Sequence, residues 1–579
     1  MPALLEVCDL AVHHVGDGGR PAVALDGVSL EVSEGEVVGL LGESGCGKTT
    51  LLLAILGLLP DSARVVRGTI RFRGRDLLAA DEPERRGLRG SRISIILQEP
   101  ALALNPVRRA GAQVAEIVQA HRGGSGRRCR EEALSALAEV GFSEPGRIYD
   151  SYPHELSGGQ RQRVVIAQAL VCRPALVLAD EPTASLDTTA QAELRALLQE
   201  LQGRLNLSML LVSHDLGALA AIARRVLVMY AGRLVEAGTP ADVFAGPLHP
   251  YSLCGRGGFP PRSQDRRPTR PACRKVARSS RVARIDCRRA SSALPGRSSR
   301  RKAAVSGASS MEAEPPLLHV RGLTKTYAGR RRGRPAVPAL AGIDLQITSG
   351  TDLALVGQSG SGKSTLARCI VRLEEPTSGE IRFEGADLLA LRGRRLLAFR
   401  ERIQLILQDS AAALDPRMSA LDIVSEPLDV LGRGGRIDQH RRALELMETV
   451  GIPSGWAERR PRELSGGQRQ RLAIARALTL APRLLILDEA FSGLDVSIQA
   501  QIAGLLQDLK ARHALTYLYI SHDLALMGAL ADEVAIMFEG RIVEHGDVAR
   551  VFGDPRHAHT RALIAASPRW PGAAAPPAP

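Results

Sequence analysis

The sequence predicts two α/β domains in tandem, each made of an α/β core and a helical subdomain. At 579 residues the chain is too long for a single ordinary core. The block "LLGESGCGKTTLL" at Leu40 returns as "LVGQSGSGKSTLA" at Leu355. The block "LSGGQRQRVVIAQAL" at Leu156 returns at Leu464 as "LSGGQRQRLAIARAL". Two long copies indicate a duplicated domain and not a solenoid of short repeats.

Each copy presents its elements in the same order. Apolar runs suited to buried strands occupy residues 36–42, 175–181, 352–357 and 483–489. Two of these runs lead into glycine turns, which are followed by helical patterns at 48–59 and 363–373. The pattern becomes mainly helical from Pro100 to about Pro153, and from Ser410 to about Pro461. We therefore expect a helical insert in each α/β core.

The net charge of +14 lies in one segment of the chain. Between Cys254 and Ser310 there are 16 Lys and Arg against 2 Asp and Glu, which leaves 60 of each from the totals of 76 and 62. This segment is rich in Arg, Ser, Pro and Gly without apolar periodicity, a composition typical of a disordered linker. Phe259 is its only aromatic residue, so a tail for nucleic acid or anionic lipid is the weaker interpretation. The expected organisation is domain 1–253, basic linker 254–316, domain 317–568 and Pro/Ala-rich tail 569–579.

A further hypothesis concerns the origin of the linker. Met311 opens "MEAEPPLLHV" much as Met1 opens "MPALLEV". The first repeat departs abruptly from the second after Leu253. Two adjacent genes joined through out-of-frame sequence would produce this pattern.

The sequence does not favour insertion into a membrane or export. The longest apolar stretch, Leu51–Leu59, ends at Pro60, well short of the roughly 18–20 residues of a spanning helix. Glu6 and Asp9 stand where a secretory signal would carry positive charge and an apolar run. The eight cysteines lack metal-ligand spacing, which indicates reduced cytosolic thiols. Any membrane role is expected to be peripheral.

Two glycine-rich loops fit the pattern GxxxxGK followed by Thr or Ser. Glycines at a strand-to-helix turn let backbone N–H groups converge on phosphate oxygens. Lys48 and Lys363 are expected to reach the β- and γ-phosphates, and the Thr49 and Ser364 hydroxyls to bind Mg²⁺. The expected phosphate-binding residues are Gly42, Glu43, Ser44, Gly45, Cys46, Gly47, Lys48, Thr49 and Thr50, with Gly357, Gln358, Ser359, Gly360, Ser361, Gly362, Lys363, Ser364 and Thr365.

A pair of carboxylates ends an apolar strand in each copy. The first of each pair, Asp180 or Asp488, suits Mg²⁺ coordination. The second, Glu181 or Glu489, suits the role of a general base that polarises the attacking water.

The LSGGQ blocks bring the chain into close resemblance with the ATP-binding-cassette (ABC) family. The resemblance implies that each signature helix start contacts the γ-phosphate of ATP held by the other domain. It also implies a glutamine that senses Mg²⁺, a switch histidine at the γ-phosphate and an aspartate that links the two sites. The matching residues are Ser157, Gly158, Gly159, Gln160, Ser465, Gly466, Gly467 and Gln468 for the signatures, Gln98 and Gln408, His214 and His522, and Asp187 and Asp495.

One difference separates the two copies at the base of the nucleotide. Tyr327 matches the aromatic residue that stacks on adenine in this family, whereas alignment places His14 at the equivalent position of the first copy. Because an imidazole stacks less well, we expect weaker nucleotide binding at the first loop.

The segments "QEPALALNP" and "QDSAAALDPR" resemble the branch of the family that imports dipeptides, oligopeptides, glutathione or nickel. The resemblance implies an ATPase, with ATP and Mg²⁺, at the cytoplasmic side of the cell membrane. Its implied partners are two membrane permeases and an extracytoplasmic solute-binding protein, and no specific nucleic acid is expected. The alternative is a soluble tandem ATPase that acts on ribosomes or nucleic acid without a permease.

Overall fold

The computed structural model describes residues 3–15, 21–183, 186–213, 216–245, 316–327, 337–408 and 413–566. We call residues 3–245 the first cassette and residues 316–566 the second cassette. The expected basic linker, apart from Pro316, and the expected tail lie outside the described residues, as does His214. Among the helices of the described ranges, none has the length and apolar character required to cross a membrane.

The first cassette contains two β-sheets. A four-stranded antiparallel sheet has the order β2-β1-β4-β5, with β1 (Ala3–Val15), β2 (Pro21–Ser33), β4 (Ala63–Phe72) and β5 (Arg75–Asp76). A six-stranded sheet has the order β10-β9-β3-β8-β7-β6, with β3 (Val37–Gly42), β6 (Ile93–Ile96), β7 (Leu176–Asp180), β8 (Ser208–Ser213), β9 (Arg225–Tyr230) and β10 (Arg233–Gly238). The six-stranded sheet is parallel except for the antiparallel pair β9–β10.

The second cassette repeats both sheets in the same topology. Its antiparallel sheet has the order β12-β11-β14-β15, with β11 (Leu318–Tyr327), β12 (Val337–Ile347), β14 (Ser378–Phe383) and β15 (Ala386–Asp387). Its six-stranded sheet has the order β16-β17-β18-β13-β19-β20, with β13 (Leu353–Val356), β16 (Ile403–Ile406), β17 (Leu484–Asp488), β18 (Thr516–Ser521), β19 (Glu533–Phe538) and β20 (Arg541–Asp547).

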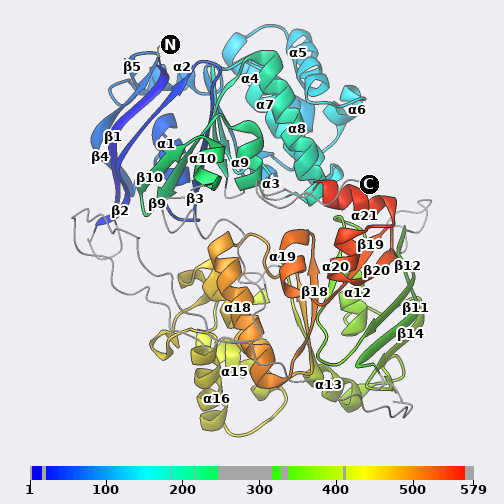
Figure 1. The fold of residues 1–579 in the computed structure, drawn as a ribbon. Helices are drawn as coiled ribbons and strands as arrows, with labels where there is room; N and C mark the ends of the chain where they lie inside the picture. The colour runs from blue at the N-terminus through cyan, green and yellow to red at the C-terminus, as the bar shows by residue number, and fades with distance from the viewer. Residues whose placement is uncertain are drawn as a thin grey trace, which may run out of the picture. The chain divides into compact units, whose positions relative to one another are not determined.

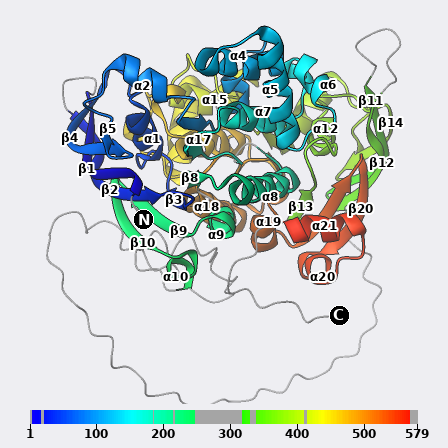
Figure 2. The ribbon, with the colours of Figure 1, turned by 90° about the horizontal axis from the view of Figure 1, so that it is seen from above.

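Helices surround these sheets, and the predicted helical inserts are confirmed. The first cassette has α1 (Lys48–Leu56), α2 (Glu82–Leu88), α3 (Pro100–Ala103), α4 (Ala110–Arg122), α5 (Gly126–Glu139), α6 (Pro145–Asp150), the 3₁₀ turn η1 (Pro153–Glu155), α7 (Gly158–Leu170), α8 (Thr188–Leu205), α9 (Leu216–Ile222) and α10 (Pro240–Ala245). The second has α12 (Lys363–Ile370), α13 (Gly393–Arg402), α15 (Ala420–Val430), α16 (Arg436–Thr449), the 3₁₀ turns η2 (Ser454–Trp456) and η3 (Pro461–Glu463), α17 (Gly466–Leu478), α18 (Val496–His513), α19 (Leu524–Leu530), α20 (Val548–Gly553) and α21 (Ala558–Ala566). In the first cassette, α4, α5 and α6 lie at the end away from β1, β4 and β5 (Figures 1 and 2).

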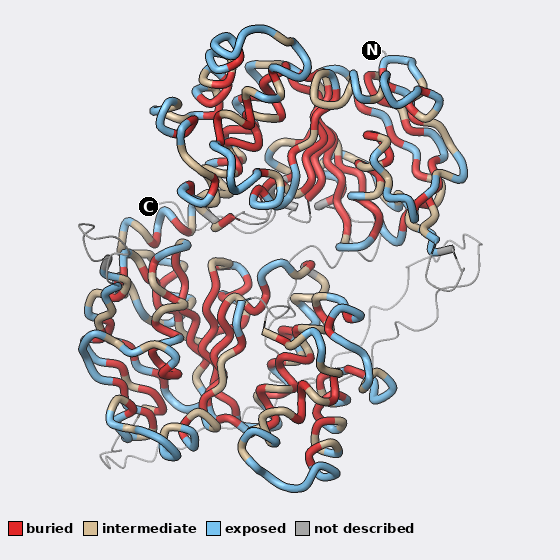
Figure 3. Tube along the Cα trace, turned by 180° about the vertical axis from the view of Figure 1, so that it is seen from behind, coloured by how far each residue is buried: buried red, intermediate tan, exposed pale blue. Residues whose placement is uncertain are grey.

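The central strands are buried on both faces, which explains their continuous apolar sequence. In β3, Leu40 packs into a core shared with α1 and the antiparallel sheet, whereas its neighbour Leu41 packs into a core shared with α4, α5 and α7. The second cassette has the same two cores. Figure 3 shows the buried strands running through the middle of each cassette. Because these strands are parallel, their carboxyl ends meet at one edge of the sheet, where functional residues of open α/β folds gather.

Candidate active site

Each glycine-rich loop joins the end of a central strand to the first turn of a helix. Gly47 and Gly362 precede α1 and α12 with φ angles of 110° and 106°, in the left-handed region. A Cβ at Gly47 would stand 2.6 Å from the Ala24 carbonyl oxygen, and one at Gly362 would stand 2.4 Å from the Ala339 carbonyl oxygen. These positions therefore require glycine for two independent reasons, conformation and space.

The two loop lysines are held alike. Lys48 Nζ donates to the carbonyls of Gly42 and Glu43 at 2.8 and 2.7 Å. Lys363 Nζ makes the equivalent bonds to Gly357 and Gln358 at 2.7 and 2.8 Å. Both lysines are buried, and burial lowers the pKa of Lys363. Lys48 Nζ also lies 3.9 Å from Glu181 Oε1, and Lys363 Nζ lies 3.5 Å from Ser361 Oγ. A buried ammonium group held mainly by neutral carbonyls can exchange them for anionic oxygens.

A hydroxyl from each loop contacts the aspartate at the end of a neighbouring strand. Thr49 Oγ1 donates to Asp180 Oδ2 at 2.9 Å, and Ser364 Oγ donates to Asp488 Oδ1 at 3.1 Å. Burial raises the pKa of both carboxyls, and the hydroxyl hydrogen bond opposes that rise. The strand order thus joins residues 131 and 124 positions apart into the oxygen set that Mg²⁺ prefers.

The glutamates that follow these aspartates have a left-handed backbone conformation in place of the extended one. Glu181 and Glu489 have φ angles of 45° and 48°, a conformation that is costly for residues other than glycine and recurs at functional sites. Gln98 Nε2 donates to Glu181 Oε2 at 3.3 Å, and Gln408 makes the same contact with Glu489 at 2.5 Å. The structure therefore brings each predicted glutamine to its predicted general base.

In the second cassette, His522 also lies close to the predicted general base, Glu489. Its Nδ1 lies 3.5 Å from Glu489 Oε1. Burial raises the pKa of Glu489, but the hydrogen bond and charge of His522, together with the charge of Lys363, outweigh burial, so the pKa is lowered. Glu489 is therefore anionic at neutral pH.

Each signature serine caps a helix. Ser157 Oγ accepts from Gln160 N at 3.2 Å while Gln160 Oε1 accepts from Ser157 N at 3.1 Å. Ser465 and Gln468 form the same reciprocal pair. The caps aim N–H groups and a hydroxyl outward from helix starts, as anion binding requires.

Two hydrogen bonds join each loop to the other cassette. Ser44 N donates to Asp495 Oδ1 at 2.8 Å, which places the second predicted linking aspartate at the first loop. Gln358 Nε2 donates to Thr189 Oγ1 at 2.8 Å, close to the other linking residue, Asp187. The sequence did not single out Thr189, since a threonine in a helix start carries no signal of its own.

A cleft of about 1530 Å³ is lined by both loops. It includes Lys48, Lys363 and the first signature residues Ser157–Gln160. The second signature, Ser465–Gln468, does not line this cleft among the described residues.

The strand register confirms the equivalence of His14 and Tyr327. His14 pairs with Ala22 in the first cassette, and Tyr327 pairs with Val337, its counterpart, in the second. His14 lines the cleft beside the first loop. Tyr327 is 39% exposed and donates its hydroxyl to Glu374.

Two strand–loop–helix phosphate sites, each with a strand-end Asp–Glu pair, define a tandem P-loop nucleoside triphosphatase. A profile described as ABC transporter matches residues 25–184 and 340–492. The oligopeptide transport ATP-binding protein OppD of Mycobacterium tuberculosis is 41% identical over 98% of this chain and 99% of its own length. The chain therefore belongs to the ABC transporter family.

Two further relatives cover both cassettes. The peptidoglycan transport ATP-binding protein YejF of Agrobacterium fabrum is 40% identical over 97% of this chain and 96% of its own length. The glutathione import ATP-binding protein GsiA of Salmonella typhimurium is 39% identical over 97% of this chain and 88% of its own length. This chain is accordingly an ATP-binding, ATP-hydrolysing subunit of an ABC importer. The tandem arrangement within one chain is shared with these relatives.

Proposed function

We propose that the chain powers uptake of peptides, or of a related small solute such as glutathione or nickel, from the cytoplasmic side of the cell membrane. It would act on two permease subunits that receive solute from an extracytoplasmic binding protein. The observation that carries this proposal is the presence of two phosphate loops, each beside a strand-end Asp–Glu pair, in one chain whose relatives are named for peptide, peptidoglycan or glutathione transport. We therefore expect the chain to work at a membrane together with permease partners.

Each site would hydrolyse ATP by the same steps. The loop N–H groups and lysine would hold the β- and γ-phosphates, and the carboxylate of Glu181 or Glu489 would accept a proton from water. The water oxygen would bond to the γ-phosphorus while the bond to the β-bridging oxygen breaks, releasing ADP and phosphate. Gln98, Gln408, His214 and His522 would orient the water and sense the γ-phosphate.

The donor set fits Mg²⁺ in both cassettes. Thr49 with Asp180, and Ser364 with Asp488, present a hydroxyl and a carboxylate within hydrogen-bond distance, and Gln98 and Gln408 lie nearby. When bound there, Mg²⁺ would neutralise charge on the phosphate oxygens.

A groove in the second cassette supports the proposed contact with a permease. It has a volume of about 450 Å³ and is lined by residues of α13, the segment around Leu407, α15 and α17. Leu397 and Val430 in its wall are 47% and 75% exposed. Because Leu407 precedes Gln408, a permease segment seated here would sense the state of the nucleotide site. In the first cassette, Leu102 is likewise exposed, at 81%, near Gln98.

The test is purification of the full-length, tagged chain from detergent-solubilised membranes of its host. We expect two polytopic membrane proteins to co-purify, and the complex in proteoliposomes to hydrolyse ATP faster when a peptide-loaded binding protein is added. Recovery of ribosomes without membrane proteins would overturn the proposal in favour of the soluble alternative.

A point variant separates docking from catalysis. Val430→Asp places a carboxylate beside the leucines of the groove wall, so we expect loss of permease co-purification with ATP binding retained. Ile437→Asp is the matched control, because Ile437 is 86% exposed on α16 and does not line the groove. Equal co-purification of both variants would exclude the groove as the docking surface.

A further inference from the structure

The aromatic residue of the second nucleotide site is tethered by a carboxylate. The Tyr327 hydroxyl donates a hydrogen bond to Glu374. Glu374 is 23% exposed, and Arg368 Nη1 on helix α12 lies 3.5 Å from its other oxygen. Lys325 Nζ lies 5.2 Å from the centroid of the Tyr327 ring. Glu374 therefore holds the ring at its hydroxyl end and Lys325 lies over one face, while Arg368 contacts Glu374.

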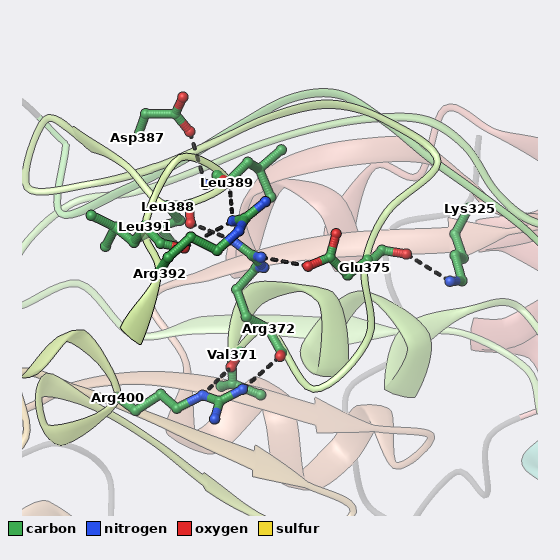
Figure 4. Close-up of polar contacts among 10 residues, drawn as sticks. All are labelled: Lys325, Val371, Arg372, Glu375, Asp387, Leu388, Leu389, Leu391, Arg392 and Arg400. Atoms are coloured by element: carbon green, nitrogen blue, oxygen red, sulfur yellow. Dashed lines mark hydrogen bonds and ion pairs between the residues drawn. The ribbon is translucent and has the colours of Figure 1, made fainter. Parts of the chain in front are cut away.

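The neighbours of Glu374 in the chain, Arg372 and Glu375, are braced by further contacts (Figure 4). Lys325 Nζ donates to the Glu375 carbonyl at 2.6 Å, tying this segment to strand β11 two residues from Tyr327. Arg372 donates to the Glu375 carboxylate at 2.6 Å and to the Leu388 carbonyl at 2.5 Å. Arg400 on α13 donates to the Arg372 carbonyl at 2.7 Å. Glu374 thus sits on a segment fixed from both sides.

The first cassette has no counterpart of the contact between Glu374 and Arg368. Sequence position relative to the loop lysine makes Leu53 the counterpart of Arg368 and Leu59 that of Glu374. The matching backbone bonds Leu58 N to Leu53 O, and Leu373 N to Arg368 O, at 2.8 and 2.9 Å, confirm this correspondence.

The side chains that brace this segment are also replaced there, with one exception. The counterparts of Arg372, Glu375 and Lys325 are Gly57, Pro60 and Val12, none of which can form these side-chain bonds. Only the counterpart of Arg400 is retained. It is Arg89, which donates to the carbonyls of Leu56 and Gly57.

From these contacts we infer that Glu374, supported by Arg368, is a positioning residue that pre-orients Tyr327 for stacking on the base in the second nucleotide site. A tethered ring loses less freedom when a base stacks on it, so affinity rises without a new contact to the ligand. The inference rests on the proposed stacking role of Tyr327. It makes the second cassette the tighter binding site through its support as well as through its aromatic residue.

The test uses the full-length chain with Lys48→Ala, so that the second site dominates binding. We expect Glu374→Leu, which installs the residue of the first cassette, to weaken ATP binding about fivefold, as the loss of a charge-assisted hydrogen bond allows. Glu374→Gln, whose Oε1 can still accept a hydrogen bond from the Tyr327 hydroxyl, should retain most of the affinity for ATP. Glu380→Leu on β14 removes a carboxylate that does not contact Tyr327 and serves as the control.

Two readouts distinguish positioning from a general structural effect. Inorganic tripolyphosphate has no base, so its affinity should not change in Glu374→Leu. In the Tyr327→Phe background, which lacks the hydroxyl, Glu374→Leu should cause no further loss. Additive losses in the double variant, or an equal loss for tripolyphosphate, would overturn the inference.

Failure of the underlying role has a different signature. If Tyr327→Ala leaves ATP affinity unchanged, the base does not stack on Tyr327 at all. If Tyr327→Ala weakens binding and Glu374→Leu does not, stacking stands and the positioning role is wrong.

Discussion

The two cassettes agree at the phosphate loops and the strand-end aspartates, and they differ around the base and at the start of the central strand. Both loop lysines donate to two loop carbonyls, and both strand-end aspartates accept from a loop hydroxyl. Around the base, His14 stands against the tethered Tyr327. Triphosphate chemistry tolerates little variation in geometry, whereas base stacking only tunes affinity. The residues of the phosphate loops and strand ends are therefore alike in the two cassettes, whereas the residues around the base have diverged.

A second difference lies at the start of the central strand. Val37 opens β3, and its counterpart Asp352 precedes β13 and is 4% exposed. Lys510 Nζ lies 2.8 Å from Asp352 Oδ1 and 3.6 Å from Asp532 Oδ2. Burial raises the pKa of Asp352 to about 6, against the opposing effect of Lys510. The second cassette therefore carries a buried charge cluster where the first has an apolar residue.

The largest expected effect tests whether the cassettes are catalytically alike. Replacing both general bases, Glu181→Gln with Glu489→Gln, should lower the ATP hydrolysis rate by about 10²–10⁴-fold, because neither site could then take the proton from water. The two single variants should lose comparable amounts, measured as phosphate release at saturating ATP. A large loss in one single variant and none in the other would show that only one cassette hydrolyses ATP.

A smaller effect concerns stability and pH. Below pH 3.8, the ordinary pKa of an aspartate, Asp352 is protonated in both the folded and the unfolded protein. Between pH 3.8 and about pH 6 it is protonated in the folded protein only. The folded state then holds more protons, so the free energy of unfolding of the second cassette should fall by about 2–3 kcal/mol as pH rises from 4 to 7. Asp352→Asn should flatten this slope, measured by denaturant unfolding.

Tryptophan fluorescence is a selective probe for that experiment. Both tryptophans, Trp456 and Trp570, follow the linker, so their signal reports the second half of the chain. Asp508→Asn, an exposed change on α18 two residues from Lys510, is the control and should keep the slope. An unchanged slope in Asp352→Asn would rule out this carboxyl as its source.

The smallest effect concerns the base. With Lys363→Ala isolating the first site and Lys48→Ala the second, ATP should bind the first site about fivefold more weakly, since an imidazole offers less stacking surface than a phenol. Equilibrium titration with a fluorescent ATP analogue, competed by ATP, measures both. His14→Tyr should narrow the gap, and equal affinities in the two parent variants would contradict the prediction.

Most residues of the active site could be predicted from short stretches of sequence. Each glycine loop, strand-end carboxylate pair and capped signature helix is encoded within a short stretch, so its geometry follows from neighbouring residues. The groups that sequence reasoning missed are long-range. Glu374 lies 47 residues from Tyr327, and Thr189 lies 169 residues from Gln358. A glutamate after a helix or a threonine in a helix start has no pattern that names its partner.

The sequence by itself determined the duplicated α/β architecture, the two phosphate loops and the His14–Tyr327 difference, because each depends on residue type and local spacing. Tertiary structure alone decided that Asp352 is buried against Lys510 and that Glu374 holds Tyr327. The physical reason is that burial and side-chain pairing depend on strand order and helix packing, which bring together groups that are distant along the chain.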